Sequence, residues 1–145
     1  KIFIIGNGGS SAIASHVQND LCKGANVRAM VFHDTPLLTA YSNDISYEDA
    51  YAECLKLWAE PGDLLIAISS SGRSKNILNA VTLAKDMGCQ VVTLSGFSPE
   101  NPLRQMGDIN IYVESDEYGI VETAHTTILH YITDRIKHES GRRLS

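Results

Sequence analysis

The chain has 145 residues, of which 43% are hydrophobic and 20% are charged, so it fits one globular domain that can bury a core of its own. Its net charge of −5 argues against nucleic acid as a general partner, because proteins that bind phosphate backbones usually carry a basic face. No apolar stretch approaches the ~20 residues of a membrane span and no signal peptide precedes Lys1, so we expect no membrane association and a cytoplasmic location.

The first predicted elements are a strand over residues 1–5 (KIFII), a glycine-rich turn over residues 6–11 (GNGGSS) and a helix that ends near residues 23–24. Glycines let the backbone approach a phosphate, serines add hydroxyl groups, and the first turn of a helix supplies free N–H donors. The turn therefore predicts an anion site that includes Asn7, Gly8 and Ser10. The same helix places His16 and Asp20 four residues apart on one face, which suits an acid–base or metal-binding pair.

The middle of the chain predicts a second strand over residues 28–33 and a helix start at residues 34–36 (DTP). Residues 37–58 are broadly helical with a break at residues 42–44. Residues 64–68 (LLIAI) form an uninterrupted apolar run, as expected of a central parallel strand that is buried on both faces. A second serine-rich turn over residues 69–74 (SSSGRS) follows this strand, and then a helix over residues 76–87 that Gly88 ends.

The last part of the chain predicts a strand over residues 90–95, a short helix over residues 102–106, a strand over residues 108–113 and a long helix from Ile120 onward. Strands and helices thus alternate along the whole sequence. This alternation predicts an α/β fold, with a doubly wound five-stranded parallel sheet and helices on both faces, as a single domain over residues 1–145.

The two glycine- and serine-rich turns should meet in space. In a doubly wound sheet the ligand lies beyond the carboxyl ends of the strands, at the point where the strand order switches. The turns after the first and third strands would then face one crevice. We therefore expect a small phosphate group to be bound by the serine hydroxyls of both turns: Ser10, Ser69, Ser70, Ser71 and Ser74.

Two nucleotide-binding patterns fit less well. A dinucleotide fingerprint, G-x-G-x-x-G, needs glycine where Ser11 stands, and the acidic residue that binds the ribose should come ≈ 20 residues later, whereas Asp34 lies further away. A P-loop would need G-K-[ST], which does not follow the turn. The three cysteines are odd in number and far apart, so they predict buried thiols in a reducing compartment, without disulfides: Cys22, Cys54 and Cys89.

Three motifs in order resemble one known family. They are residues 6–10 (GNGGS) with His16 after them, residues 68–74 (ISSSGRS), and the spacing Glu122-x₂-His125-x₄-His130. Together they resemble the SIS (sugar isomerase) family, which has a flavodoxin-like fold, and within it they are most similar to the phosphoheptose isomerases. The resemblance implies an aldose–ketose isomerase that acts on sedoheptulose 7-phosphate through an enediolate, and a homotetramer with sites near subunit interfaces.

The resemblance also assigns roles to residues. The serines named above would hold the sugar phosphate, with Ser70 where threonine is usual in the family. Asp20 and His130 correspond to the proton-transfer pair, and Glu122 corresponds to a substrate-binding position. In family members that contain zinc, the metal is held at four positions, which correspond here to His16, Asp20, Glu122 and His130.

The sequence departs from the family pattern in three ways. Asp20 is one methylene shorter than the family's glutamate, and a displacement of ~1 Å in a catalytic group can cost about 10²-fold in rate. Glu122 replaces a glutamine, which adds a negative charge and a ligand that metals favour. Family members also carry a helical segment before the first strand, and its absence here leads us to expect a fragment of a longer chain.

Several alternatives stay open at this point. Glu122 and His130 lie about 12 Å apart along a straight helix, so they share one metal ion only through extended rotamers, a helix that begins after Glu122, or two different subunits. His125 could be a polar neighbour of the site or a core histidine, and Arg73 could meet phosphate or solvent. A non-catalytic phosphosugar-binding regulatory module, or an isomerase of another sugar phosphate, would carry the same serines.

Overall fold

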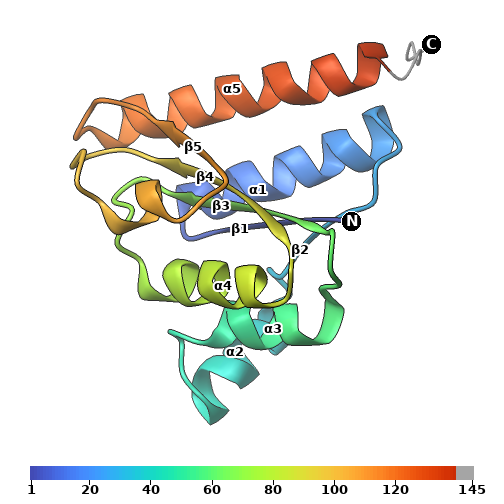
Figure 1. Ribbon diagram of the computed structural model, residues 1–145, viewed down its shortest axis with the longest axis vertical. Coiled ribbons are helices and arrows are strands. Elements are labelled where there is room, and N and C mark those ends of the chain that lie inside the picture. Colours follow the sequence, from blue (N-terminus) through green and yellow to red (C-terminus); the bar gives the residue numbers. More distant parts are fainter. Residues whose placement is uncertain (140–145) are drawn as a thin grey trace.

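The computed structural model describes residues 1–139, which contain a five-stranded sheet (Figure 1). Every pair of neighbouring strands is parallel, and the strand order is β2-β1-β3-β4-β5. The strands are β1 (Ile2–Gly6), β2 (Ala29–Val31), β3 (Leu64–Ser69), β4 (Gln90–Ser95) and β5 (Ile109–Tyr112). The predicted α/β fold with a doubly wound parallel sheet is confirmed.

Helices connect the strands. They are α1 (Gly9–Asn19), α2 (Thr35–Asp44), α3 (Ala50–Trp58), α4 (Lys75–Asp86) and α5 (Tyr118–Glu139), with a π-helical turn η1 (Asp20–Gly24) and a 3₁₀ turn η2 (Pro102–Gln105). A break divides the predicted helical region, but its position differs from the prediction: residues 42–44 still belong to α2, and the break lies at residues 45–49. The long helix begins at Tyr118, two residues before the predicted start, and β2 is shorter than predicted because it pairs through only three residues with β1.

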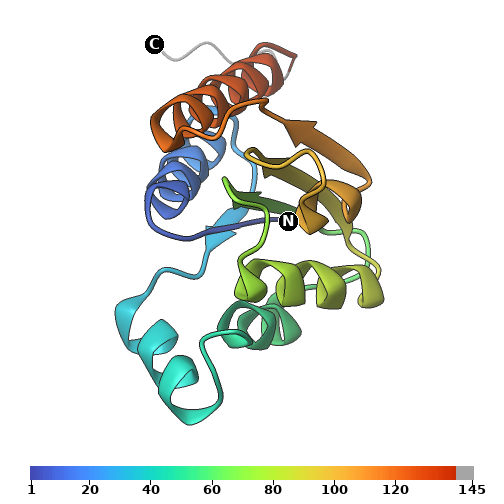
Figure 2. The same cartoon turned by 90° about the vertical axis from the view of Figure 1, so that its left-hand side faces the viewer.

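The helices form a layer on each face of the sheet (Figure 2). On one face, α1 and α5 lie side by side, and residues such as Ile13, Val17 and Leu129 pack on Ile4 and Ile68 of the sheet. On the other face, α3 and α4 bury a second apolar cluster against the sheet. Because both faces are covered, the central strand β3 is apolar from Leu64 to Ile68, as its LLIAI run predicts.

The strand order reverses between β1 and β3. These two strands pair in register up to Gly6 and Ile68, so the chain leaves both of them at the same edge of the sheet. One strand then leads into α1 and the other into α4, which cover opposite faces. This is the switch point at which ligands bind in doubly wound sheets, and the two predicted turns meet there.

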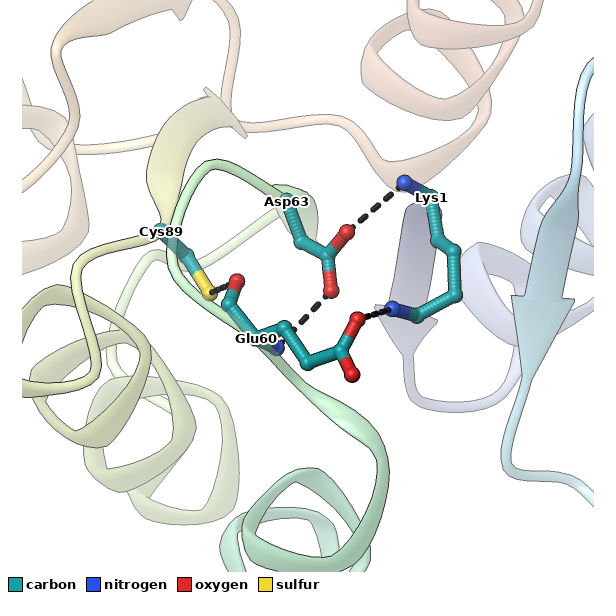
Figure 3. A network of polar contacts seen from close by, with 4 residues as sticks. All are labelled: Lys1, Glu60, Asp63 and Cys89. Carbon is teal, nitrogen blue, oxygen red and sulfur yellow. Dashed lines mark hydrogen bonds and ion pairs between the residues drawn. The ribbon is translucent and has the colours of Figure 1, made fainter.

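The opposite edge of the sheet carries a closed polar network (Figure 3). Asp63, which is buried, accepts hydrogen bonds from the backbone nitrogen of Lys1 (2.7 Å) and from the Glu60 N–H (2.8 Å). The Lys1 Nζ pairs with the Glu60 carboxylate at 2.6 Å, and the Cys89 thiol donates to the Glu60 carbonyl. Burial acts to raise the pKa of Asp63, but these hydrogen bonds outweigh it and lower the pKa to about 2.

All three cysteines are free thiols, as predicted, but only two are buried. Cys54 and Cys89 lie in the core, and burial raises the pKa of the Cys54 thiol to about 11. The prediction was wrong for Cys22, which is exposed. Cys22 lies in the π-helical turn η1, where the neighbouring Leu21 is the residue that points into the core. None of the described helices is both long and apolar enough to span a bilayer.

Candidate active site

A cavity of about 260 Å³ lies at the switch point, at the carboxyl ends of β1 and β3. The turn after β1, the turn after β3 and the first turn of α5 form its walls. Its lining residues are Asn7, Gly8, Gly9, Ser10, Ile68, Ser69, Ser70, Ser71, Ser74, Tyr118 and Glu122. The structure therefore brings together all the residues that the sequence predicts for phosphate and substrate binding.

The serine hydroxyls of the cavity are only partly engaged by the protein. The Ser69 hydroxyl donates to the Ser74 oxygen at 3.3 Å, and the Ser71 oxygen accepts the Arg73 N–H at 3.3 Å. Ser70 is only 5% exposed, and its buried hydroxyl has no hydrogen-bond partner among residues 1–139. Because the cavity serines make few hydrogen bonds within the protein, the cavity is suited to a ligand that bonds their hydroxyl groups.

Two helix N-termini border the same cavity. Gly8 at the N-cap of α1 and Ser74 at the N-cap of α4 both line it, and neither helix has a side-chain cap. Gly8 has a φ of 54°, a conformation that glycine adopts without strain. The positive ends of two helix dipoles therefore face a cavity lined by hydroxyl groups, which favours an anion such as phosphate.

A polar network holds Asn7 at the mouth of the turn. Asn7 and the buried Asn76 of α4 exchange two amide hydrogen bonds, each 2.9 Å long, and Tyr47 donates to the Asn7 side chain at 2.9 Å. The Asn76 oxygen also accepts the N–H of Ile77. The first turn of α4 thus fixes a cavity residue on the neighbouring connection.

Glu122 lies at the cavity and apart from His130. A Cβ atom at Gly9 would overlap the Glu122 carboxylate, so α5 places this carboxylate against the start of α1. Because α5 is continuous from Tyr118, the alternative of a helix that begins after Glu122 is excluded. Within the described residues, the cluster that could hold a metal ion contains three of the four predicted residues and does not contain Glu122.

That cluster consists of His16, Asp20 and His130. The Asp20 Oδ2 atom lies 3.3 Å from His16 Nε2 and 3.4 Å from His130 Nδ1, and the two imidazole rings are 4.8 Å apart. All three side chains are partly exposed. One potential ligand atom from each lies within 4.8 Å of the others, and two imidazoles with one carboxylate are the donor set of catalytic zinc sites.

The π-helical turn η1 begins at Asp20. Its wider ring brings Leu21 into the core and ends the helix at Gly24, where the sequence predicts the end. π-Helical turns are rare and often mark functional sites. The local backbone thus changes at the carboxylate that both histidines contact.

The other histidines and Arg73 take no part in the cavity or the cluster. His125 is fully buried, its Nε2 lies 3.2 Å from the Ser95 carbonyl, and burial lowers its pKa. It is therefore the core histidine of the two alternatives. Arg73 is exposed and does not line the cavity, so solvent is its environment in this structure. His33 follows β2 and contacts the Ser15 hydroxyl at 3.0 Å.

Sequence reasoning missed one aromatic residue of the site. Tyr118 lines the cavity from the first turn of α5, on the same helical face as Glu122. The signal was the four-residue spacing between Tyr118 and Glu122, but the predicted helix began too late to include it.

The chain is similar to proteins of one family over most of its length. Residues 1–96 match the family described as SIS domain. The phosphoheptose isomerase of Geotalea daltonii is 33% identical over 94% of this chain and 74% of that protein. The phosphoheptose isomerase of Helicobacter hepaticus is 36% identical over 97% of this chain and 74% of that protein. The structure of a phosphoheptose isomerase from Francisella tularensis, 30% identical, matches with a TM-score of 0.89 over 95% of this chain and 76% of that one.

Proposed function

This chain belongs to the SIS domain family, among the phosphoheptose isomerases, and we propose that it interconverts sedoheptulose 7-phosphate and D-glycero-D-manno-heptose 7-phosphate. The cavity binds the phosphate through its serines and helix N-termini. The cluster of His16, Asp20 and His130 carries out the proton transfers. The second-best candidates are a regulatory module that binds the sugar without turnover and an isomerase of a shorter sugar phosphate.

The distance between the cavity and the cluster supports the seven-carbon substrate. Gly9 lines the cavity and His16 belongs to the cluster, seven residues later on the same face of α1, which corresponds to about 10 Å. Eight bonds separate C1 of a heptose from its terminal phosphorus, and an extended chain advances ~1.2 Å per bond, so the ligand spans about 10 Å. A pentose 5-phosphate is two carbons shorter and would leave the cluster out of reach. The similarity to phosphoheptose isomerases, 33% and 36% identical to this chain, is the observation that carries the proposal, and this match in length adds to it.

The proposed chemistry moves protons between adjacent carbons. The Asp20 carboxylate removes a proton from C1 of the ketose, the C1–C2 double bond forms, and the C2 carbonyl oxygen takes the electron pair to give the enediolate. His130 protonates that oxygen and accepts the proton of the C1 hydroxyl group, and Asp20 returns its proton to C2 to give the aldose. The contact of 3.4 Å between His130 and Asp20 keeps both groups within reach of adjacent substrate atoms.

The cluster also fits the zinc ion that the family resemblance implies. Three protein ligands with a fourth position open to substrate are typical of catalytic zinc sites, so His16, Asp20 and His130 suffice without Glu122 of the same chain. When bound, zinc would polarise the carbonyl group as a Lewis acid. In the structure, both histidines contact the Asp20 Oδ2 atom and thereby orient the carboxylate that takes the substrate proton.

The proposal includes a homo-oligomer, as a tetramer, in the cytoplasm. α5 exposes Ile120 and Tyr131 to solvent, and exposed large apolar side chains on one helix support burial by another subunit. A phosphorylated sugar and three free thiols are consistent with a reducing cytoplasmic compartment. The mass of the protein in solution tests the oligomeric state.

The decisive experiment is an isomerisation assay with sedoheptulose 7-phosphate in deuterated water, with and without added zinc. We expect turnover and incorporation of solvent deuterium at the carbon next to the carbonyl, because the proton passes through Asp20. Binding of the sugar phosphate without any exchange would support the regulatory module instead. Faster incorporation of deuterium into a pentose phosphate than into sedoheptulose 7-phosphate would contradict the inferred seven-carbon substrate.

A further inference from the structure

Phe97 has a strained backbone at the edge of the sheet where the cavity lies. It follows β4 by two residues and has a φ of 58°, which L residues rarely adopt. Asn26 is the other non-glycine residue with a positive φ among residues 1–139, and asparagine tolerates this conformation better. Strained backbone conformations cluster at functional sites, so the strained backbone of Phe97 next to the cavity indicates a functional role for its side chain.

Hydrogen bonds fix Phe97 on both sides. Its N–H donates to the Ser115 carbonyl and its carbonyl accepts the Tyr112 hydroxyl, each at 2.8 Å. The preceding Gly96 N–H donates to the Ser70 carbonyl at 2.9 Å, and a Cβ at Gly96 would overlap Val121 of α5. Residues 96–97 therefore connect the serine turn after β3 to the first turn of α5, and they are packed too tightly to change conformation.

The Phe97 ring supports Tyr118. The two rings meet edge to face, with centroids 4.8 Å apart. Tyr118 lines the cavity although 61% of its surface is exposed, and its hydroxyl has no hydrogen-bond partner among the described residues. Phe97 thus holds the Tyr118 ring, with its hydroxyl group available to a ligand, at the rim of the cavity that is suited to phosphate.

We propose that Tyr118 is a specificity-determining residue that contacts the carbon chain of the substrate next to its phosphate, and that Phe97 positions it. This inference rests on the proposed function, because it assumes a phosphosugar in the cavity. The serines and helix N-termini bind the phosphate. The Tyr118 ring packs against C–H groups of the sugar, and its hydroxyl donates a hydrogen bond to a sugar oxygen. Tyr118 therefore makes the site prefer a sugar phosphate over inorganic phosphate.

Calorimetric titration with two ligands tests the proposal. In the Tyr118→Ala variant we expect the affinity for sedoheptulose 7-phosphate to fall about tenfold while the affinity for inorganic phosphate stays within about twofold. Tyr118→Phe should retain part of the effect, and Phe97→Ala should weaken sugar-phosphate binding in the same selective way. His138→Ala is the matched control, because His138 is exposed on the same helix and does not line the cavity.

Each other outcome overturns the inference. Equal losses for both ligands would mean a structural role, and no loss would mean that Tyr118 lies outside the contact surface. A wild-type chain that binds sedoheptulose 7-phosphate no more tightly than inorganic phosphate would show that nothing recognises the sugar. Binding does not depend on turnover, so a wild-type chain that binds selectively without isomerising the sugar contradicts only the proposed function.

Discussion

The two edges of the sheet treat their polar groups in opposite ways. At the amino edge, Lys1, Glu60, Asp63 and Cys89 satisfy one another in a closed network (Figure 3). At the carboxyl edge, the two serine-rich turns border a cavity, the Ser70 hydroxyl has no hydrogen-bond partner among residues 1–139, and Phe97 keeps a strained backbone. Polar groups thus stabilise the fold at one edge and are left available for a ligand at the other. Substitutions at the two edges should therefore separate activity from stability.

The largest effect should come from Asp20, in the cluster at the end of α1. Asp20→Asn should lower turnover of sedoheptulose 7-phosphate by about 10²–10⁴-fold, because an amide cannot accept the substrate proton. Sugar-phosphate affinity and melting temperature should change little, since Asp20 is partly exposed and lies outside the phosphate cavity. Steady-state kinetics with calorimetry measure both; retained turnover would exclude Asp20 as the base.

Asp20→Glu sharpens this test, because it restores the residue usual in the family. One carboxylate oxygen of Asp20 already contacts both His16 and His130, so the cluster is built around the shorter side chain. We expect the longer side chain to lower turnover by about 10²-fold through misplacement. An increase in turnover would mean that aspartate is only a weakened base.

The next effect concerns metal. Protein purified without chelator should contain close to one zinc per chain, and His130→Ala should weaken zinc binding by at least about 100-fold, because loss of a ligand exceeds the 10–100-fold effect of outer-shell changes. Metal analysis measures the content. His138→Ala, on the same helix and outside the cluster, is the control. Less than a tenth of an equivalent in the wild type would contradict the metal site.

A smaller effect is expected in the phosphate cavity. Ser71→Ala should weaken sugar-phosphate binding by roughly 1.5–3 kcal/mol, the value of a hydrogen bond to a charged oxygen. The Ser69→Ala and Ser71→Ala double variant should lose more, with little change in the free energy of unfolding. Ser42→Ala, on α2 and outside the cavity, serves as control. Unchanged affinity of the double variant would remove the serines from the phosphate site.

The smallest effect on activity is expected at the amino edge. Asp63→Asn should lower the free energy of unfolding by about 1–3 kcal/mol, because it weakens buried hydrogen bonds, and should leave turnover unchanged. The pKa of Asp63 is lowered from 3.8 to about 2, so its ionised form stabilises the folded state above pH 3.8 and this stabilisation is lost as the pH falls toward 2. Denaturant unfolding at several pH values should show that loss in the wild type and not in the variant. An equal pH dependence in both would assign the effect elsewhere.

The sequence predicted the arrangement that depends on periodicity and strand ends. The apolar run of β3 and the strand–turn–helix pattern at the start of the chain fix which turns share an edge, so the serines were placed together. The spacing of His16 and Asp20 on one helix face predicted their contact. Both predictions depend only on the regular geometry of a strand or a helix, which does not change with the packing around it.

The rest depends on packing that the sequence does not display. Glu122 lies at the cavity because α5 starts at Tyr118 and packs against Gly9, and neither fact follows from the apolar stripe of the helix. The positive φ of Phe97 is a property of the folded backbone, fixed by Tyr112 and Ser115 from a later strand and loop. Contacts between residues far apart in the sequence therefore determine that Glu122 and Phe97 lie beside the predicted site.

The partly engaged serine hydroxyls of the cavity also have a consequence for heat resistance. A ligand that bonds these hydroxyls binds only the folded chain, and it raises the free energy of unfolding by RT ln(1 + [L]/Kd), about 2.7 kcal/mol at a concentration of 100 Kd. For a domain of this size, that corresponds to a rise in melting temperature of several degrees. Thermal denaturation with a panel of sugar phosphates would thus rank candidate substrates without an enzyme assay, and the compound that best fills the cavity would give the largest rise.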